Sequence, residues 1–346
     1  MKIAIDCRMI NSSGIGTYLS GVLPYLLKEK HKFLLIGSKE KLIKYNEMNN
    51  VEVLDCDIKI FSLKEFLFFP IKKINNCDIF YSPFFNIPGK IKIPIYTTIH
   101  DVIFLDMPEL ISKPGYLIRK YFYKRAYRLS KKIFTVSEFS KNRIKHFLGN
   151  KKEIIVTYNG ISDFILEKSD EEYIKKDYLI FVGNIKKHKG LKILLEAFTE
   201  LKKEGYLYKL VIVGEQNNFK TKDEEVIKIL ENSKLNKDII FTGYVDNKKL
   251  KKLIAEAKIL IQPSLYEGFG IPPLEALTLG TDVILSDIEV FKEIYSDLPV
   301  NFFEIENKKN LKEKILNFKR KNKNQKNNYN YINCAEIIKI NMWRDI

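Results

Sequence analysis

Ser264-Leu-Tyr-Glu-Gly-Phe-Gly-Ile-Pro-Pro-Leu-Glu-Ala-Leu-Thr-Leu-Gly280 is the stretch that decides how this chain folds. The apolar run at 258–262 before it has the length and branched residues of a buried strand. Pro272 and Pro273 mark the start of a helix, because a proline there loses only an amide that has no intrahelical partner. The stretch therefore predicts a strand, a glycine loop and a helix in succession, as in a parallel α/β sheet.

The loop of this stretch also predicts a ligand site. Gly268 and Gly270 let bare backbone approach a ligand closely, and free amides at a helix start favour an anion such as phosphate. Two carboxylates flank the loop, Glu267 before it and Glu275 in the expected first helical turn. They would repel phosphate and suit neutral hydroxyl groups better, so the combination indicates a phosphorylated sugar. For Glu275 a purely structural role at the helix dipole stays open.

Apolar runs alternate with helical patterns along almost the whole chain, which predicts parallel sheets wound on both faces. A polar, acidic passage over 162–177 interrupts the alternation and is the expected linker. We therefore expect an α/β protein of two tandem doubly wound, Rossmann-like domains with a ligand cleft between them. The predicted strands are 2–6, 33–37, 51–54, 78–81, 93–99, 132–136, 153–157, 178–182, 209–213, 238–242, 258–261 and 282–285.

Composition narrows the classes of partner. A length of 346 residues suits two domains of roughly 150 residues each. The net charge of +16 is compatible with nucleic acid, anionic lipid or a phosphorylated substrate. An AT-rich coding bias toward Lys, Asn and Ile would give the same charge without any partner. No nucleic-acid module signature accompanies the charge, so nucleic acid is not an expected partner.

Several features predict a cytoplasmic protein. No apolar run is long enough for a membrane span, and the start at 1–6 reads as a strand rather than a signal peptide. The segments 61–73 and 113–128 mix aromatic with basic residues at helical spacing, which suits the inner face of the cytoplasmic membrane. Ordinary helices packed on a sheet would look similar. The cysteines lack the paired spacing of a zinc site or disulfide framework; they are Cys7, Cys56, Cys77 and Cys334.

Two further glycine loops are candidates for phosphate contact. The loop 11–16 opens a helix and holds Gly14 and Gly16, which permit close approach to a diphosphate. It lacks the third glycine of a dinucleotide fingerprint, so a plain tight turn is the alternative. The loop 183–190 carries Lys189 at a helix start, where a lysine can neutralise charge on a diphosphate leaving group. A solvated lysine cluster is the alternative there.

His100 and Asp101 end the predicted strand 93–99 and so lie at a carboxyl edge of the sheet. This position favours a His100 that reaches a sugar hydroxyl or the reacting centre over a structural histidine held by its neighbouring carboxylate. Asp55 and Asp57 form a D-x-D pair that can hold a metal on a nucleotide diphosphate. No other ligands cluster with them, so no metal site is predicted.

These motifs together resemble those of the family 4 glycosyltransferases of the GT-B fold. Glu267 and Glu275 form that family's E-x7-E motif, and the resemblance covers nearly the whole chain. Each motif is modest, but their order and spacing are highly specific. Within the family, the chain resembles the bacterial α-mannosyltransferase-like enzymes of surface polysaccharide assembly. The other landmarks are 13–16, 100–101, 135–140, 158–161, 181–183 with Lys189, and 241–245.

The resemblance implies a domain plan. Residues 1–165 would form an N-terminal acceptor-side domain, and residues 170–330 a C-terminal domain that binds a nucleotide sugar. The closing helix, 331–346, would pack back on the first domain.

The resemblance also implies roles for the matching residues. Glu275 would bind the ribose hydroxyls, Glu267 and the backbone of 268–271 the sugar, and Lys189 the diphosphate. The family usually adds an arginine, whose two positions hold Asn184 and His188 here; His188 is expected to supply a partial, pH-dependent charge. The implied catalytic residues are His100, Asp101, Lys189 and Glu267. The implied donor-binding residues are Gly14, Gly16, Asn184, His188, Lys189, Val245, Glu267, Gly268, Phe269, Gly270, Ile271 and Glu275.

The expected activity is transfer of a hexose, with retention of configuration and without metal or other cofactor. The best match is mannose from GDP-mannose, added to a lipid-linked glycan in bacterial surface polysaccharide synthesis. A UDP-hexose-dependent glycosyltransferase and a sugar-nucleotide epimerase on the same fold are the enzymatic alternatives. A basic lipid- or nucleic-acid-binding protein is the non-enzymatic one.

Overall fold

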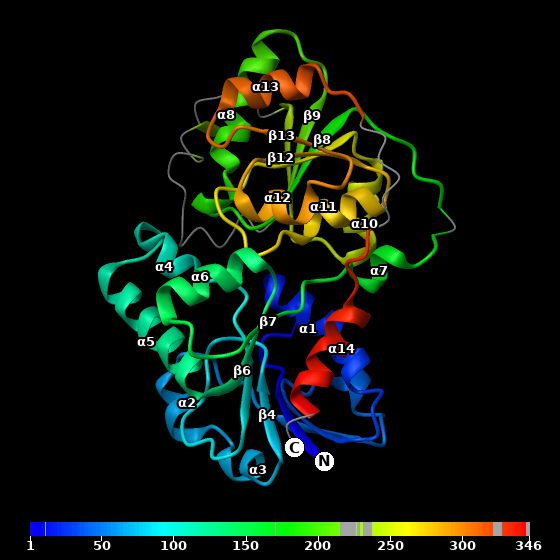
Figure 1. The fold of residues 1–346 in the computed structure, drawn as a ribbon. Coiled ribbons are helices and arrows are strands. Elements are labelled where there is room, and N and C mark those ends of the chain that lie inside the picture. The colour runs from blue at the N-terminus through cyan, green and yellow to red at the C-terminus, as the bar shows by residue number, and fades with distance from the viewer. Residues whose placement is uncertain are drawn as a thin grey trace. The chain divides into compact units, whose positions relative to one another are not determined.

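The computed structural model describes residues 1–10, 12–169, 171–214, 226, 229–230, 237–320 and 327–343. The chain divides into two compact units, Met1–Gly160 with Tyr329–Ile346, and Ile161–Asn328. Each unit is built on its own parallel sheet with helices on both sides (Figure 1). The prediction of two doubly wound α/β domains is confirmed.

The first unit holds a seven-stranded sheet of order β3-β2-β1-β4-β5-β6-β7 within its described residues. All neighbouring strands pair in parallel. The central strands are buried on both faces, which is why they read as continuous apolar runs in the sequence. Their bounds are β1 Lys2–Asp6, β2 Lys32–Gly37, β3 Val51–Asp55, β4 Ile79–Ser82, β5 Ile95–Thr98, β6 Ser130–Thr135 and β7 Ile154–Val156.

The helices of the first unit include the closing helix of the chain, which packs against α1. The contact is close: a Cβ on Gly21 of α1 would lie 2.2 Å from the ring of Tyr331. Gly160 is equally tight, with a Cβ site 2.2 Å from the Tyr331 amide. The helices are α1 Ser13–Leu26, α2 Leu63–Phe68, α3 Ile71–Asn75, α4 Ile103–Asp106, α5 Lys113–Leu129, α6 Glu138–Leu148 and α14 Tyr331–Trp343, with 3-10 turns η1 Ile43–Tyr45 and η2 Pro108–Leu110.

The second unit holds a six-stranded parallel sheet of order β10-β9-β8-β11-β12-β13 in the part of the chain that is described. Sequence reasoning missed its last strand, β13, a short edge strand with the polar Asn301 inside it. The strands are β8 Tyr178–Val182, β9 Lys209–Val213, β10 Ile239–Gly243, β11 Ile259–Gln262, β12 Asp282–Ser286 and β13 Val300–Phe303. The helices are α7 Asp163–Leu166, α8 Leu191–Lys203, α10 Asn247–Glu256, α11 Ile271–Thr278, α12 Glu289–Tyr295 and α13 Lys308–Leu316, with the 3-10 turn η3 Lys187–Lys189.

Helix α8 shows how this core forms. Apolar side chains at helical spacing, among them Leu191, Leu194 and Leu201, are fully buried against the sheet. Burying one such side chain is worth about 1.5–3 kcal/mol relative to leaving it in water. The helix is thereby fixed with its first turn at the carboxyl end of β8, where Lys189 lies.

The passage 162–177, predicted as a linker, is bonded to the second unit. Lys251 of α10 donates hydrogen bonds to the carbonyls of Phe164 and Glu167, at 3.0 and 2.5 Å. The Lys176 amide donates to the Glu256 carbonyl at 2.7 Å. Although its sequence is polar and acidic, this passage is therefore part of the second unit and not an unattached linker.

Candidate functional site

The site residues of the second unit lie where the strand order reverses. Strand β8 is paired with β9 on one side and with β11 on the other. Such a switch point leaves a crevice outside the carboxyl ends of two neighbouring strands. The loops that leave these ends are 183–190 and 263–270, which carry most of the predicted donor-binding residues.

An ion pair joins the two loops. The Lys189 ammonium lies 2.6 Å from Oε1 and 2.7 Å from Oε2 of Glu267. The Lys189 side chain keeps 22% of its surface exposed and Glu267 keeps 10%, so solvent still reaches the pair. The structure brings together two residues that sequence analysis chose independently, one as a phosphate ligand and one as a sugar ligand.

Glu267 has a second set of partners on its own loop. The Ser264 hydroxyl donates to Glu267 Oε1 at 2.8 Å, and the Gln262 amide nitrogen lies 3.1 Å from that hydroxyl. Gln262 ends β11, and both it and Ser264 are buried. Sequence reasoning missed these two residues. Their position at the end of the strand that precedes Glu267 was the available signal.

Two glycines let the loops pack against each other and against the core. Gly190 has φ +67°, and a Cβ there would lie 1.9 Å from the Pro263 carbonyl oxygen. The nearby His188 carbonyl accepts from the Leu265 amide at 2.7 Å. Gly270, which caps α11 with φ +88°, leaves no room for a Cβ beside the Phe291 ring. These two positions need glycine because of both conformation and space.

The rest of the loop before α11 offers backbone rather than side chains. Phe269 is 2% exposed, so its ring belongs to the core. The Tyr295 hydroxyl donates a hydrogen bond to the Gly270 carbonyl. Gly268 is partly exposed, and Ile271 begins α11 with no side-chain cap on its first amides. Pro272 and Pro273 carry no N–H, so the backbone donor that the first turn of α11 offers to an anion is the Ile271 amide.

Glu275 does not lie in the first helical turn, because α11 begins at Ile271 and Glu275 is its fifth residue. The expected alternative role at the helix dipole is therefore wrong. The side chain is buried, and its Oε1 accepts from the Ser162 hydroxyl at 3.0 Å. Burial raises the pKa of Glu275 to about 7, although the Ser162 hydrogen bond opposes the shift. A carboxylate held this way binds hydroxyl groups well once it is ionised.

His188 does not supply the expected charge. Burial, with a smaller effect from the neighbouring Lys189, lowers the pKa of His188 to about 4. The ring is therefore neutral near pH 7, and the prediction of a partial, pH-dependent positive charge is wrong. Asn184, at the other position of the family's arginine, is exposed in the loop.

The remaining donor-binding candidates lie elsewhere. Val245 is half-buried in the loop after β10, further along the same sheet edge. Gly14 and Gly16 of the first unit were expected in a loop, but α1 already begins at Ser13. Gly14 is exposed with open space where a Cβ would stand, which leaves its backbone accessible. Gly16 is buried. Asn11 lies outside the described residues.

His100 follows the carboxyl end of β5 in the first unit. Its Nε2 donates to the Pro83 carbonyl at 3.0 Å, and its ring meets Tyr18 edge-on at 4.8 Å. Because a carbonyl only accepts, the proton is on Nε2 and Nδ1 is an acceptor. Burial lowers the pKa of His100 to about 4, so the ring is neutral at pH 7. Asp101 does not hold the ring through Nε2; its Oδ1 accepts from the Ile103 amide at 3.1 Å.

The described residues contain neither a candidate metal centre nor a membrane-spanning helix. In the part of the chain that the structure describes, His, Cys, Asp and Glu side chains form no group of three or more that could hold a metal ion. Asp55, of the D-x-D pair, accepts from the Lys39 amide at 3.0 Å. Within the described ranges, no helix combines the length and apolar character needed to cross a bilayer.

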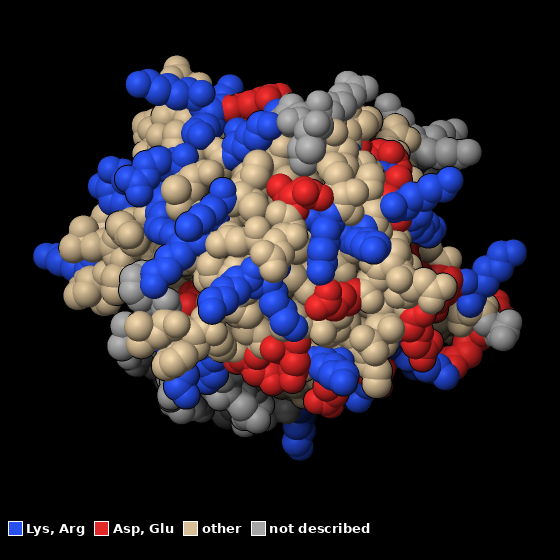
Figure 2. All heavy atoms as spheres, turned by 90° about the horizontal axis from the view of Figure 1, so that it is seen from below, with Lys and Arg blue, Asp and Glu red and all other residues tan. Residues whose placement is uncertain are grey.

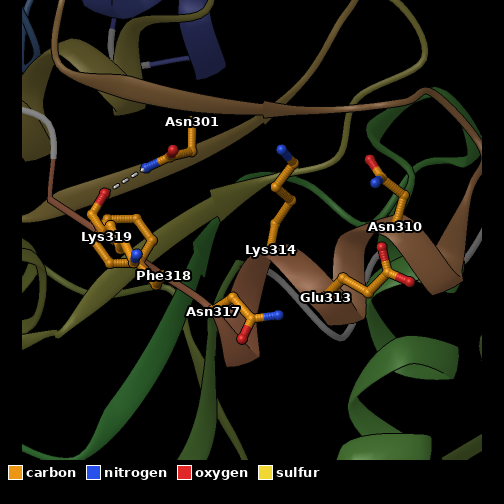
Figure 3. Close-up of a pocket in the computed structure, with 7 residues that line it drawn as sticks. All are labelled: Asn301, Asn310, Glu313, Lys314, Asn317, Phe318 and Lys319. Atoms are coloured by element: carbon orange, nitrogen blue, oxygen red, sulfur yellow. Dashed lines mark hydrogen bonds between the residues drawn. The ribbon is translucent and has the colours of Figure 1, made fainter.

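A pocket of about 350 Å³ lies between β13 and α13, lined mainly by polar side chains (Figure 3). The Asn301 amide donates to the Lys319 carbonyl at 3.2 Å across it. The lining residues 317–319 follow the end of α13, a helix that runs back from the carboxyl end of β13. The pocket therefore lies away from the edge that carries Lys189 and Glu267.

Comparison with known proteins identifies the class. A model of "Glycosyltransferase Family 4" matches residues 13–163, and one of "Glycosyl transferases group 1" matches residues 164–333. Solved structures share the fold over nearly the whole chain. Sucrose-phosphate synthase from Thermosynechococcus elongatus aligns with a TM-score of 0.68 at 13% identity, over 91% of this chain and 89% of that one. Anabaena HepE in complex with UDP-glucose aligns with a TM-score of 0.69 at 16% identity, over 98% and 94%.

Several curated relatives are glycosyltransferases of bacterial O-antigen synthesis. O-antigen chain mannosyltransferase B of Escherichia coli is 27% identical over 230 residues, which cover 63% of this chain and 59% of that protein. O-antigen chain mannosyltransferase RfbU of Salmonella typhimurium is 32% identical over 204 residues, 58% of this chain and 54% of that one. The chain thus spans little more than half the length of these relatives. The fold, together with the two family models, defines a GT-B glycosyltransferase. The chain belongs to the family 4 glycosyltransferases, on the matches to both halves of the fold.

Proposed function

We propose that this protein is a retaining glycosyltransferase that moves mannose from GDP-mannose onto a lipid-linked glycan at the inner face of the cytoplasmic membrane. The observation that carries the proposal is the Lys189–Glu267 pair between two glycine loops at the switch point. The mannosyltransferase names of two relatives support the choice of sugar.

In the proposed mechanism, the donor's diphosphate attracts Lys189 away from Glu267. The ammonium and the Ile271 amide at the start of α11 then stabilise the charge that builds on the leaving phosphate. Glu267, held by Ser264, accepts hydrogen bonds from the sugar hydroxyls. Glu275 does the same for the ribose hydroxyls, which replace or join the Ser162 hydroxyl.

The bond between the anomeric carbon and the diphosphate oxygen breaks, and the acceptor hydroxyl oxygen bonds to that carbon from the same face. The acceptor's proton goes to the leaving phosphate oxygen, so neither a metal nor a redox cofactor takes part in the proposed step. His100 is neutral at pH 7, because burial lowers its pKa to about 4, so it can accept a hydrogen bond from a hydroxyl group through Nδ1 but supplies no positive charge. Asp101 supports the turn that follows His100.

A UDP-hexose donor is the second candidate, because HepE, a protein of the same fold, was solved with UDP-glucose. An epimerase on this fold would release altered sugar and nucleotide with no acceptor.

Product analysis with each donor, with and without EDTA, tests the proposal. We expect an α-linked hexose on the acceptor and nucleoside diphosphate in equal amount, unchanged by EDTA. If EDTA abolished transfer and Asp55→Ala did so too, a metal site at Asp55 and Asp57 would be supported. Salt-sensitive RNA binding without turnover would favour the non-enzymatic alternative.

A further inference from the structure

Helices α2 and α5 of the first unit both expose large apolar side chains. Phe61, just before α2, packs against α5 on its core-facing side: its ring lies 4.7 Å from Phe122 and 4.3 Å beneath the Arg119 guanidinium. Both helices lie on the same side of this unit in Figure 1. Among the described side chains of these helices, the apolar residues that are more than half exposed are Leu67 at 68%, Phe68 at 70%, Leu117 at 64%, Ile118 at 52% and Tyr121 at 60%. We call these five residues, with the cations beside them, the α2–α5 surface.

The outward face of α5 changes from apolar to basic along its length. Leu117, Ile118 and Tyr121 lie on the face opposite the buried Tyr123 and Ala126. Lys124 and Arg128 lie on the same exposed face, about one and two helical turns after Tyr121. An ordinary surface helix turns its apolar face inward and its polar face to water. Here the outward face has the pattern of a helix that lies at a lipid–water boundary.

The charge of this surface is almost entirely positive. Helix α5 contains no acidic residue, and α2 with α3 contain only Glu65. Glu65 is buried and paired with Arg8 at 2.7 Å, so it adds no negative charge at the surface. The exposed acid nearest α5 in sequence is Glu109, on η2. The cations that these helices expose are Lys64, Lys72, Lys73, Lys113, Lys124 and Arg128.

Figure 2 shows the same imbalance, because blue Lys and Arg side chains gather in the left part of that view, while red ones lie mostly in its middle and right. The left is also the side on which Figure 1 draws α2 and α5.

We propose that the α2–α5 surface docks this protein on an anionic lipid bilayer. Leu67, Phe68 and Leu117 would enter the boundary between headgroups and acyl chains, while Lys124 and Arg128 bind lipid phosphates. A second copy of the chain fits poorly, because a self-complementary contact would set cations against cations. Nucleic acid would match the charge but gives no reason for several aliphatic side chains to be exposed together.

Docking here would serve a lipid-anchored acceptor. Helix α5 follows the carboxyl end of β5 through α4 and η2, so its first turns adjoin the sheet edge that carries His100. Binding of vesicles needs neither donor nor turnover. A test of vesicle binding therefore gives a result that is independent of the proposed transfer reaction.

Flotation of the full chain with vesicles tests the proposal. We expect binding to phosphatidylcholine vesicles that contain phosphatidylglycerol, little binding to phosphatidylcholine alone, and loss of binding as salt rises from about 0.05 M to about 0.5 M. Leu117→Ser with Ile118→Ser and Tyr121→Ser should lower the partition coefficient roughly tenfold or more. Lys124→Gln with Arg128→Gln should lower it on anionic vesicles and weaken its salt dependence.

Matched controls come from the second unit. Ile174 and Leu207 are exposed at 71% and 86%, and Ile174→Ser with Leu207→Ser should leave binding unchanged. All replaced residues are exposed, and melting temperatures equal to that of the unmodified chain establish that the variants fold. If the triple variant unfolds, the charge variant and the salt series decide. No binding to the anionic vesicles, equal binding to both vesicle types, or a concentration-dependent dimer that the triple variant loses would each overturn the proposal.

Discussion

Lys189 and Glu267 are 78 residues apart in the sequence, yet the Lys189 ammonium contacts both carboxylate oxygens, at 2.6 and 2.7 Å. Each residue therefore holds the other in place until a ligand competes for one of them. A diphosphate would compete for the lysine, and sugar hydroxyls would then find the carboxylate already oriented by Ser264. The pair thus links binding of the two ends of one donor.

Lys189→Ala should reduce turnover by roughly 10²- to 10³-fold, the usual effect of removing one donor to a developing negative charge. Steady-state kinetics with saturating donor measures this loss. Lys187→Ala is the matched control, since Lys187 is an exposed lysine of the same loop, and it should retain near-normal turnover. Near-normal turnover in the Lys189→Ala variant would contradict the proposed role of Lys189 in stabilising the leaving diphosphate.

Glu267→Gln should separate the two ends of the donor. The amide keeps the shape of the side chain but releases Lys189 from its ion pair, so the nucleoside diphosphate alone should bind severalfold more tightly. The same variant should lose the preference for one sugar over another, since it lacks the charged acceptor for sugar hydroxyls. Calorimetric titration of nucleotide and nucleotide sugar checks both effects. Weaker binding of the nucleotide alone would contradict the competition between carboxylate and phosphate.

Donor affinity should increase as pH rises through about 7, because Glu275 has a pKa of about 7. Its carboxyl group must be ionised to accept hydrogen bonds from both ribose hydroxyls. The sign for stability is opposite. The folded protein holds this proton more tightly than the unfolded chain does, with its ordinary pKa of 4.5. The free energy of unfolding without donor should therefore fall by at most about 3 kcal/mol as pH rises from below 4.5 to above 7.

Glu275→Gln should abolish both pH dependences. Ser162→Ala is the matched variant, because it removes the hydrogen bond that favours the ionised form, and it should move both transitions to higher pH. Urea unfolding between pH 4 and 8.5 and donor titration between pH 5.5 and 8.5 measure them. A donor affinity that stays constant over this range would argue against ribose binding by Glu275.

Gly190→Ala should destabilise the protein by about 2 kcal/mol or more, since it combines a left-handed backbone with a clash against the Pro263 carbonyl. Gly205→Ala is the control for the backbone effect alone. Gly205 has φ +87° but open space around its Cβ site, so its replacement should cost about 1 kcal/mol. Urea denaturation of both variants gives the comparison. Equal losses would show that the contact between the loops is unimportant.

Much of the fold followed from the sequence because buried parallel strands are apolar on both faces and stand out as runs. β13 escaped this reasoning, since Asn301 interrupts its short apolar pattern. The loop residues Lys189 and Glu267 could be chosen from glycines and strand ends, but not paired, because spacing in sequence does not say which loops meet.

Two errors have related causes. Ser162 looked like part of a linker, and nothing near it in sequence points to Glu275, 113 positions away. The pKa of His188 depends on burial that only the packed loops create.

Thermal unfolding of the unmodified chain with GDP-mannose, UDP-glucose, UDP-GlcNAc and UDP-galactose tests the central claim most directly. At a donor concentration of about 100 times Kd, binding should add about 2.7 kcal/mol to the free energy of unfolding and raise the melting temperature by several degrees. We predict that GDP-mannose raises the melting temperature more than the other donors do, and that the Lys189→Ala variant shows no such rise. No rise with any donor, or a rise that is the same in Lys189→Ala, would contradict it.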